Sequence, residues 1–355
     1  MKPTTPTVVT DKAVARADAA IMKWELEYNV ERYSDPASPY FRSIDGSFLF
    51  NSDTGESVVM IGEGLENLKA HLPVEYPIII TDLNVHDLWG AHFPQGPIIT
   101  VGIGEKIKSF DTLSYIFDQL IALEADRSSF IVGIGGGIVC DIVGFVASTY
   151  MRGLRFGFVS TTLLSQVDAS VGGKNGVNFK GYKNMVGVFN QPEFVICDLN
   201  MLSTLPREEL CCGFAEIIKH GVIADKSMFD YIEKHCSQAL ALDLNVIEKL
   251  VYDSVVIKSR IVNQDARERG LRRQLNFGHT FGHAIEKTTK VRHGEAVSAG
   301  MVIASELAAK KETLSPKDAS RIANLLDQYG LPVRLEFDCN EVLETLRMDK
   351  KRAGD

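Results

Sequence analysis

Short hydrophobic runs alternate with helical stretches along the first half of the chain. From about residue 44 the runs are SFLFNS, SVVMIG, YPIIITDLN, PIITVGIG, SFIVGIGGG and FGFVSTT, and most of them end in turn-forming residues. Stretches of helical period separate them, such as FDTLSYIFDQLIALEA. Strands that alternate with helices in this way predict a mostly parallel sheet covered by helices on both faces.

Strand-like runs stop near residue 200, and the rest of the chain has helical periodicity. Residues 11–33 also contain few helix breakers, so we expect a further helix there. The pattern therefore predicts three parts. They are an N-terminal helical extension over residues 1–43, an α/β domain over 44–199 and an all-α domain over 200–355.

Composition narrows the class of protein. The chain has 355 residues, of which 45% are hydrophobic and 24% charged, and its net charge is −8 with both signs interspersed. Without a basic field, nucleic acid and anionic membrane are poor partners. The N-terminus lacks a continuous apolar run, and no stretch approaches the roughly 20 apolar residues that span a bilayer. We therefore expect a cytoplasmic protein.

A triple glycine follows one of the predicted strands, in IVGIGGGIVCDIVGF. Glycine lets a backbone approach a pyrophosphate, and the N-terminus of the following helix offers free N–H groups. The segment is not the usual G-x-G-x-x-G of dinucleotide-binding proteins. A tight turn between strand and helix explains it equally well.

A glycine-rich segment over residues 160–189 gathers polar side chains in surroundings that are otherwise typical of a buried segment. Asp168, Lys174, Lys183 and Asn184 lie there. A buried lysine needs an anionic partner or loses its proton. The segment therefore predicts an anionic ligand such as a phosphate, and the alternative is a solvated loop.

The helix FAEIIKHGV carries charged side chains among apolar neighbours. Glu216 and Lys219 are three residues apart, next to His220. Such a pair is usually a surface salt bridge. In a buried helix the carboxylate needs a stronger reason to be inside, and binding a metal would be one.

Three histidines lie in LNFGHTFGHAIEKTTKVRHGEAV. His279 and His283 are four residues apart, so one helical face could carry both, with His293 following from the next loop. Since no CxxC spacing occurs, histidines and a carboxylate such as Glu216 would hold a metal, for which zinc is suitable. Satisfied core histidines are the alternative. Arg272 and Asn276 continue the same helical spacing towards the N-terminus.

Several long motifs, in order, resemble the 3-dehydroquinate synthases, which are sugar phosphate cyclases. They are GGGIVCDIVGFVASTYMRG, TTLLSQVDASVGGKNGVN, KNMVGVFNQP, LPREELCCGFAEIIKHGVI and LNFGHTFGHAIE followed by HGEAVSAGM. The resemblance implies a Rossmann-like NAD-binding α/β domain, an all-α metal-binding domain with zinc or cobalt(II), an active site between them, and a homodimer. The substrate implied is a sugar phosphate, 3-deoxy-D-arabino-heptulosonate 7-phosphate. It would be oxidised transiently by NAD, lose phosphate, be reduced again and close to 3-dehydroquinate.

The resemblance also implies roles for individual residues. The metal ligands would be Glu216, His279 and His293, which leaves His283 for proton transfer and phosphate. Groups that bind phosphate would be Lys174, Asn184, His283, Lys350 or Lys351, and Arg152 from a neighbouring subunit. Substrate hydroxyls and carboxylate would be held by Asp168, Lys219, Lys258, Arg272 and Asn276, and Glu268 would accept a proton. NAD would be bound by Asp82, Asn84, Glu105, Lys108, Gly136, Gly137, Asp141, Thr161, Thr162 and Lys183.

Two positions depart from the family pattern, and two other functions compete with this one. Asn175 stands where the family usually has threonine, and Tyr182 where glycine is common. The first rival is a cyclase whose substrate lacks a carboxylate, of the deoxy-inosose or valiolone type. Lys258 and Arg272 argue against it, because two buried cations without an anion carry a large desolvation penalty. The second rival is a metal-dependent NAD alcohol dehydrogenase of the glycerol type, which would not need the lysines of the phosphate site.

Overall fold

The computed structural model describes residues 43–352 except 45–46, 53–54 and 266–269. The helix expected over residues 11–33 lies outside these residues. The described chain forms two compact units. One contains Ile218–Glu233 and the chain from Arg273 onward, and the other contains the chain up to Ile217 together with Lys234–Arg272. Each unit is described separately.

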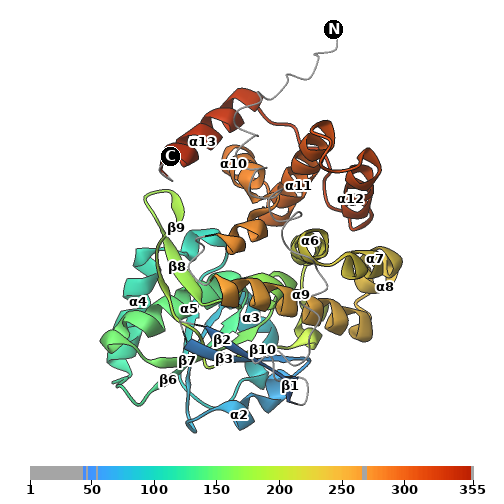
Figure 1. The fold of residues 1–355 in the computed structure, drawn as a ribbon. Coiled ribbons are helices and arrows are strands. Elements are labelled where there is room, and N and C mark those ends of the chain that lie inside the picture. Colours follow the sequence, from blue (N-terminus) through green and yellow to red (C-terminus); the bar gives the residue numbers. More distant parts are fainter. Residues whose placement is uncertain (1–42, 45–46, 53–54, 266–269, 353–355) are drawn as a thin grey trace. The chain divides into compact units, whose positions relative to one another are not determined.

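An eight-stranded sheet forms the centre of the larger unit (Figure 1). From β3 to β5 all neighbouring strands pair in parallel, and β1 and β2 add an antiparallel edge. The mostly parallel sheet predicted from the sequence is therefore confirmed. Its strands, in spatial order, are β1 (Ser43–Ile44), β2 (Ser47–Ser52), β3 (Gly55–Ile61), β10 (Phe194–Cys197), β7 (Arg155–Ser160), β6 (Phe130–Gly135), β4 (Ile78–Asp82) and β5 (Ile98–Val101).

Alternate residues of β6 explain how the two faces of the sheet are covered. Phe130, Val132 and Ile134 belong to a buried core that includes residues of the helical segments beside β3 and β4. Gly133 and Gly135 point to the other face, where a Cβ atom would lie 3.1 Å from Val143 and 2.6 Å from Val139. These two glycines let the next helix lie close against the strand.

The helices of the larger unit connect the strands or pack on them. They are α2 (Leu68–His71), α3 (Leu83–Trp89), α4 (Phe110–Ala122), α5 (Gly137–Thr149), α8 (Cys236–Leu240), α9 (Leu244–Gln264) and the first part of α6 (Arg207–Ala224). Short 3₁₀ segments include η4 (Glu105–Ile107), η5 (Tyr150–Arg152) and η7 (Leu199–Thr204), and η6 (Ser165–Ala169) is a π-helical turn. The strand, glycine turn and helix predicted over residues 131–145 are β6 and α5.

A β-hairpin follows η6, where the sequence predicts only a buried glycine-rich segment. Its strands are β8 (Lys174–Phe179) and β9 (Tyr182–Phe189). Lys180 and Gly181 join them, and both have positive φ, 49° and 81°, as a two-residue hairpin turn requires. Most of β9 is exposed, and so is Lys174. The prediction that the lysines of this segment are buried is therefore wrong, because a two-stranded sheet leaves one of its faces in water.

The smaller unit consists of helices. They are the end of α6, α7 (Lys226–Lys234), α10 (His279–Thr289), α11 (His293–Lys310), α12 (Pro316–Gln328) and α13 (Cys339–Arg352). A buried core joins α10, α11 and α13 through Ala284, Ile285, Ala296, Ala299, Val342 and Leu346. Small residues let α10 and α11 approach, since a Cβ atom on Gly300 would lie 2.0 Å from the carbonyl oxygen of Gly278.

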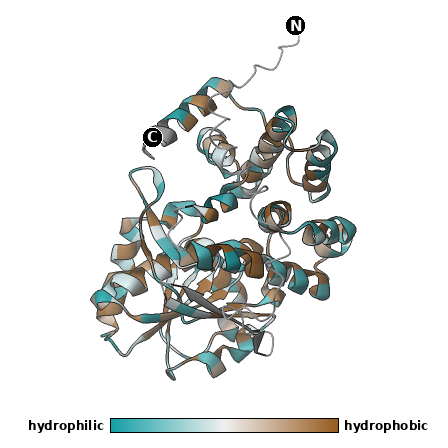
Figure 2. Cartoon of the chain, viewed as in Figure 1, coloured by the Kyte–Doolittle hydropathy of each residue, from teal (hydrophilic) through white to brown (hydrophobic). Residues whose placement is uncertain are grey.

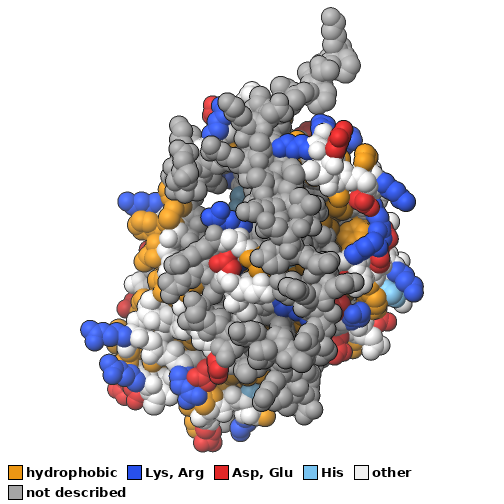
Figure 3. Space-filling view, viewed as in Figure 1, with side chains coloured by type: hydrophobic (Ala, Val, Ile, Leu, Met, Phe, Trp, Pro, Cys, Tyr) orange, Lys and Arg blue, Asp and Glu red, His pale blue; other side chains and the backbone are white. Residues whose placement is uncertain are grey.

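No strand follows β10 among the described residues, as the sequence predicts. The boundary between residues 199 and 200 stays a prediction. Helices of both units carry hydrophilic and hydrophobic residues side by side (Figure 2). On the face seen in Figure 3, basic and acidic side chains of the described residues are interspersed. No helix of the described residues is long and apolar enough to span a membrane.

Candidate functional site

Three neighbouring parallel strands end in residues that the resemblance assigns to NAD. Asp82 ends β4 and caps α3 by accepting a hydrogen bond from the Val85 N–H at 3.0 Å. Gly136 and Gly137 follow β6, and Thr161 and Thr162 follow β7. Because β4, β6 and β7 are adjacent and parallel, their carboxyl ends meet at one edge, where ligands bind in open α/β sheets. Burial raises the pKa of Asp82, against the effect of the Val85 N–H.

Lys108 connects the carboxyl edge of the sheet to the hairpin of β8 and β9. Its ammonium, with the residue 5% exposed, pairs with the Asp141 carboxylate of α5 and donates to Asn184 Oδ1 of β9 at 2.5 Å. Burial raises the pKa of Asp141 to about 6, although Lys108 opposes the change. Two of the residues expected to contact NAD and one expected to bind phosphate thus form one hydrogen-bonded group.

A second pair, between a buried lysine and a half-buried aspartate, joins α9 to the π-helical turn. The Lys258 ammonium donates to Asp168 Oδ1 at 2.5 Å and also contacts the Asp168 carbonyl oxygen. Lys258 therefore has an anionic partner within the protein, so its burial does not argue against cyclases whose substrates lack a carboxylate. Arg272 is 3% exposed.

Helix α6 buries the charged side chains that the sequence places among apolar neighbours. Glu216 and His220 are 0% exposed and Lys219 is 1% exposed. The burial expected from the apolar neighbours is therefore confirmed, and the alternative of a surface salt bridge does not apply to this helix. A carboxylate, an ammonium and an imidazole inside a protein require partners of high polarity, which is typical of a functional site.

The three histidines cluster within the smaller unit. The ring centroids of His279 and His283 are 5.2 Å apart, those of His279 and His293 are 5.2 Å apart, and those of His283 and His293 are 6.2 Å apart. His279 is 9% exposed, whereas the side chain of His283 is exposed. The sequence predicts this grouping, because four-residue spacing places two rings on one face of α10.

The single helical stripe expected from Arg272 to His283 is broken. Residues Leu271–Asn276 form a 3₁₀ helix, and α10 begins only at His279. Gly278 between them has a φ of 78°, and a Cβ atom on it would lie 2.5 Å from Met301 Cγ. The prediction of one continuous face was wrong because the close packing of α11 requires glycine in the left-handed conformation here.

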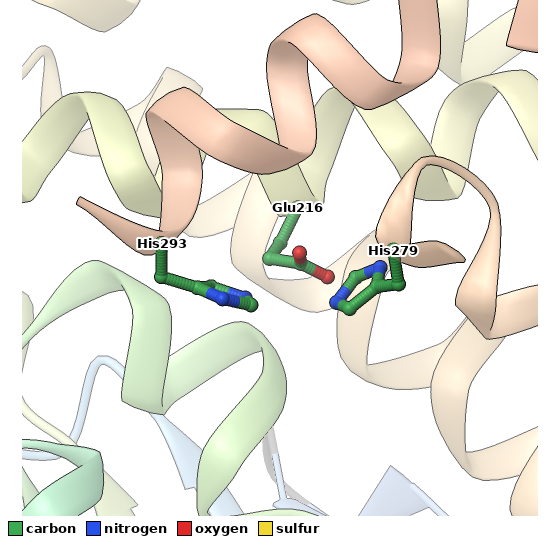
Figure 4. A group of neighbouring side chains, drawn as sticks. All are labelled: Glu216, His279 and His293. Atoms are coloured by element: carbon green, nitrogen blue, oxygen red, sulfur yellow. The ribbon is translucent and has the colours of Figure 1, made fainter. Parts of the chain in front are cut away.

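Glu216, His279 and His293 can together hold a metal ion (Figure 4). One ligand atom from each lies within 4.8 Å of the other two. Ligand atoms about 2.0–2.2 Å from a tetrahedral zinc ion lie about 3.4 Å from one another, so small side-chain movements would complete such a site. Two imidazoles and one carboxylate match the ligand types of catalytic zinc sites, which keep a fourth position open. A second group, Asp168, Glu216 and His220, meets the same distance limit but offers a single imidazole.

Glu286 lies beside one of the candidate metal ligands, and the sequence reasoning missed it. Its Oε2 atom lies 3.6 Å from His293 Nδ1. A carboxylate behind a metal-binding histidine orients the ring and raises its basicity. The signal was present in the sequence, since Glu286 lies seven residues after His279 and therefore on the same helical face.

Other residues expected at the site are distributed as follows. The side chains of Lys174, Lys183 and Asn276 are exposed. Arg152 is exposed, with a φ of 70°, in the turn after α5. Glu268 and the side chains of Lys350 and Lys351 lie outside the described residues.

Comparison with known families supports one assignment. The 3-dehydroquinate synthase N-terminal model matches residues 98–212, and the 3-dehydroquinate synthase C-terminal model matches residues 213–352. The chain belongs to the 3-dehydroquinate synthase family. The 3-dehydroquinate synthase of Nitrosomonas europaea is 40% identical over 309 residues, which are 82% of this chain and 84% of that protein. The 3-dehydroquinate synthase of Acetivibrio thermocellus is 45% identical over 254 residues, 71% of each chain.

A related solved structure extends the comparison to cofactors. The 2-epi-5-epi-valiolone synthase of Streptomyces hygroscopicus, with NAD+ and Zn2+ bound, is 26% identical to the chain with a TM-score of 0.78. The match covers 86% of this chain and 88% of that one. This chain therefore shares its fold with a synthase whose structure contains both NAD+ and Zn2+.

Proposed function

We propose that the chain is a 3-dehydroquinate synthase that converts 3-deoxy-D-arabino-heptulosonate 7-phosphate into 3-dehydroquinate and phosphate, with NAD and zinc or cobalt(II). The proposal rests on sequence identity. The chain is 40% and 45% identical to two 3-dehydroquinate synthases, but 26% identical to the valiolone synthase. The donors of Glu216, His279 and His293 fit the metal, and the glycines after β6 fit a dinucleotide.

When bound, NAD would supply reversible hydride transfer, and the metal would polarise the hydroxyl that is oxidised. The protein's own residues would bind and orient the substrate and would move protons. We assign the phosphate to Lys174, Asn184 and His283. The exposed ring of His283 lies beside the buried His279, so it can exchange a proton with substrate while His279 faces the metal.

The substrate's hydroxyls and carboxylate also need polar partners. We assign them to Lys219, Lys258, Arg272 and Asn276. The bond from Lys258 to Asp168 fixes that ammonium in position, and the burial of Lys219 and Arg272 strengthens their interaction with an anion. Glu268 stays a predicted proton acceptor.

The test uses purified protein with NAD, zinc and the heptulosonate phosphate, and follows phosphate release and dehydroquinate formation together. The matched control replaces the substrate with a sugar phosphate that has no carboxylate, and a second control offers a polyol. We expect phosphate and dehydroquinate in equal amounts from the first substrate alone. Turnover of a control substrate without turnover of the heptulosonate phosphate contradicts the proposal.

We also infer that the enzyme is a cytoplasmic homodimer in which Arg152 reaches the phosphate site of the partner. The exposed position of Arg152 at a turn supports this assignment. Light scattering would give the oligomeric state. Mixing Arg152→Ala protein with Lys174→Ala protein should restore part of the activity, because one site of the mixed dimer would keep both residues. No recovery in a mixture shown to exchange subunits would contradict it.

A further inference from the structure

We propose that Asn178 is a positioning residue that connects the NAD site to the phosphate-binding amide of Asn184. The inference rests on the proposed function and concerns a residue outside the set expected to contact substrate, cofactor or metal. All the residues involved lie in the larger unit.

Three hydrogen bonds place Asn178 at the centre of this connection. Its Nδ2 donates to Glu105 Oε1 at 2.7 Å, its Oδ1 accepts from the Asn184 N–H at 2.9 Å, and its own N–H donates to the Lys108 carbonyl at 2.9 Å. Lys108 in turn donates to Asn184 Oδ1 at 2.5 Å. Asn178, Asn184 and Lys108 thus form a closed ring of bonds, with Glu105 attached to it.

The ring determines which atoms Asn184 can offer to a ligand. Its Oδ1 accepts from Lys108, so the Nδ2 group, with two N–H donors, is the part of the amide that can face a phosphate oxygen. With the amide reversed, two donors would face the Lys108 ammonium, which also donates only. The contact with Lys108 therefore orients Asn184 for an anion.

The backbone of Asn184 also depends on Asn178. Asn184 has a φ of 52°, a left-handed conformation that costs free energy in residues other than glycine. The hairpin register shifts between Val177 and Phe179, so that Asn178 lies at an irregularity. Val177 pairs with Val186 and Phe179 with Tyr182, which leaves three residues of β9 opposite Asn178. Its Oδ1 accepts the N–H of one of them, Asn184, and so stabilises the irregular strand.

A cavity lies beside this ring, with a volume of about 370 Å³. Asn178 lines it together with Glu105, Lys108 and Lys183, three residues expected to contact NAD. One carboxylate and four lysines, Lys106, Lys108, Lys180 and Lys183, line this opening, which suits a ligand that carries both hydroxyls and phosphates. Asn178 thus connects the wall of this cavity to the amide assigned to phosphate, and each ligand should stabilise the conformation that the other needs.

The experiment compares Asn178→Ala and Asn178→Asp with wild-type protein loaded with zinc. A matched control exists in the chain, because Asn67 Nδ2 donates to Glu63 Oε1 at 2.7 Å in an exposed pair of the same chemistry. The readouts are the dissociation constant for NAD+ measured by calorimetry without turnover, KM for the heptulosonate phosphate, and the melting temperature.

We expect Asn178→Ala to raise KM for the sugar phosphate about tenfold and the NAD+ dissociation constant about fivefold, since one side-chain hydrogen bond is lost at each end. Asn67→Ala should change both by less than twofold. If Asn178→Ala also leaves both constants within twofold of wild type, the inference is overturned. Wild-type protein that binds NAD+ but does not turn over the heptulosonate phosphate would refute the proposed function alone.

Adding a negative charge at position 178 distinguishes a positioning role from simple packing. In Asn178→Asp, the new carboxylate faces Glu105 and repels it, but in a Glu105→Gln background it can accept a hydrogen bond from the amide. The Asp substitution should therefore raise the NAD+ dissociation constant at least threefold more in the wild-type background than in Glu105→Gln. An equal penalty in both backgrounds would mean that Asn178 only fills space, and would overturn the inference.

Discussion

Replacing Gly144 with alanine tests how helix α5 is joined to the hairpin. Alanine inside a helix normally stabilises by about 1 kcal/mol relative to glycine. At Gly144, however, the added Cβ atom would lie 2.0 Å from Asn175 Oδ1, 2.3 Å from its Cγ and 2.9 Å from its Nδ2. All three clashing atoms belong to one amide, which is buried and must move. The substitution is therefore expected to destabilise the protein.

The magnitude follows from the bonds that the amide makes. Asn175 Nδ2 donates to the carbonyl oxygens of Gly173 at 3.1 Å and Asn190 at 2.8 Å. Each bond contributes about 1 kcal/mol, and crowding of a packed site costs about 1–3 kcal/mol. After the gain in helix propensity, Gly144→Ala should lower the free energy of unfolding by about 2–4 kcal/mol.

The assay is thermal unfolding of Gly144→Ala, Asn175→Ala and the double variant. Asn175→Ala alone should lose about 2 kcal/mol and the double variant no more than that, because the shortened side chain makes room for the methyl group. Losses in the two single variants that add up in the double variant would refute the reasoning, as would a stabilised Gly144→Ala. Weaker NAD+ binding should accompany the single glycine variant, since α5 begins at the glycines assigned to the cofactor.

Three further predictions concern charged and metal-binding groups. His279→Ala should lose bound zinc, whereas His283→Ala should keep it and lose most activity; equal zinc contents by metal analysis would contradict these roles. The stability of wild type relative to Asp141→Asn should rise by up to about 3 kcal/mol as pH falls from 8 to 4. The reason is that the native carboxyl, with its pKa raised from 3.8 to about 6, takes up a proton at higher pH than the carboxyl of the unfolded chain. Melting temperatures of both proteins measured against pH check the sign. Lys258→Met should cost about 1–3 kcal/mol, since it removes the ammonium that pairs with the Asp168 carboxylate, and adding Asp168→Asn should recover part of the loss in the same assay.

Much of the fold was predictable from local sequence. The strands β6 and β7 and the helix α5 follow from hydrophobic runs bounded by glycine and threonine, because burial on both faces of a parallel sheet demands continuous apolar residues. The hairpin of β8 and β9 was missed. Its residues neither alternate cleanly nor form an apolar run, since most of β9 is exposed.

The candidate site was predictable only in part. Helical spacing brings His279 and His283 together, and the burial of Glu216 follows from its apolar neighbours, so these features could be read from the chain. Nothing in the sequence indicates that Lys258 pairs with Asp168, which is 90 residues away. The left-handed turn at Gly278, which breaks the expected stripe, depends on the packing of α11 against it.

Apart from the hairpin, the sequence by itself determined the alternation of strands and helices, the two classes of structure along the chain and the family to which it belongs, because periodicity and motifs are local properties. The tertiary structure decided which polar groups meet. The compact units join segments that are far apart in the sequence, and the ring of Asn178, Asn184 and Lys108 closes across a hairpin and a 3₁₀ turn. Pairing energies of this kind depend on distance and burial, which only the packed chain defines.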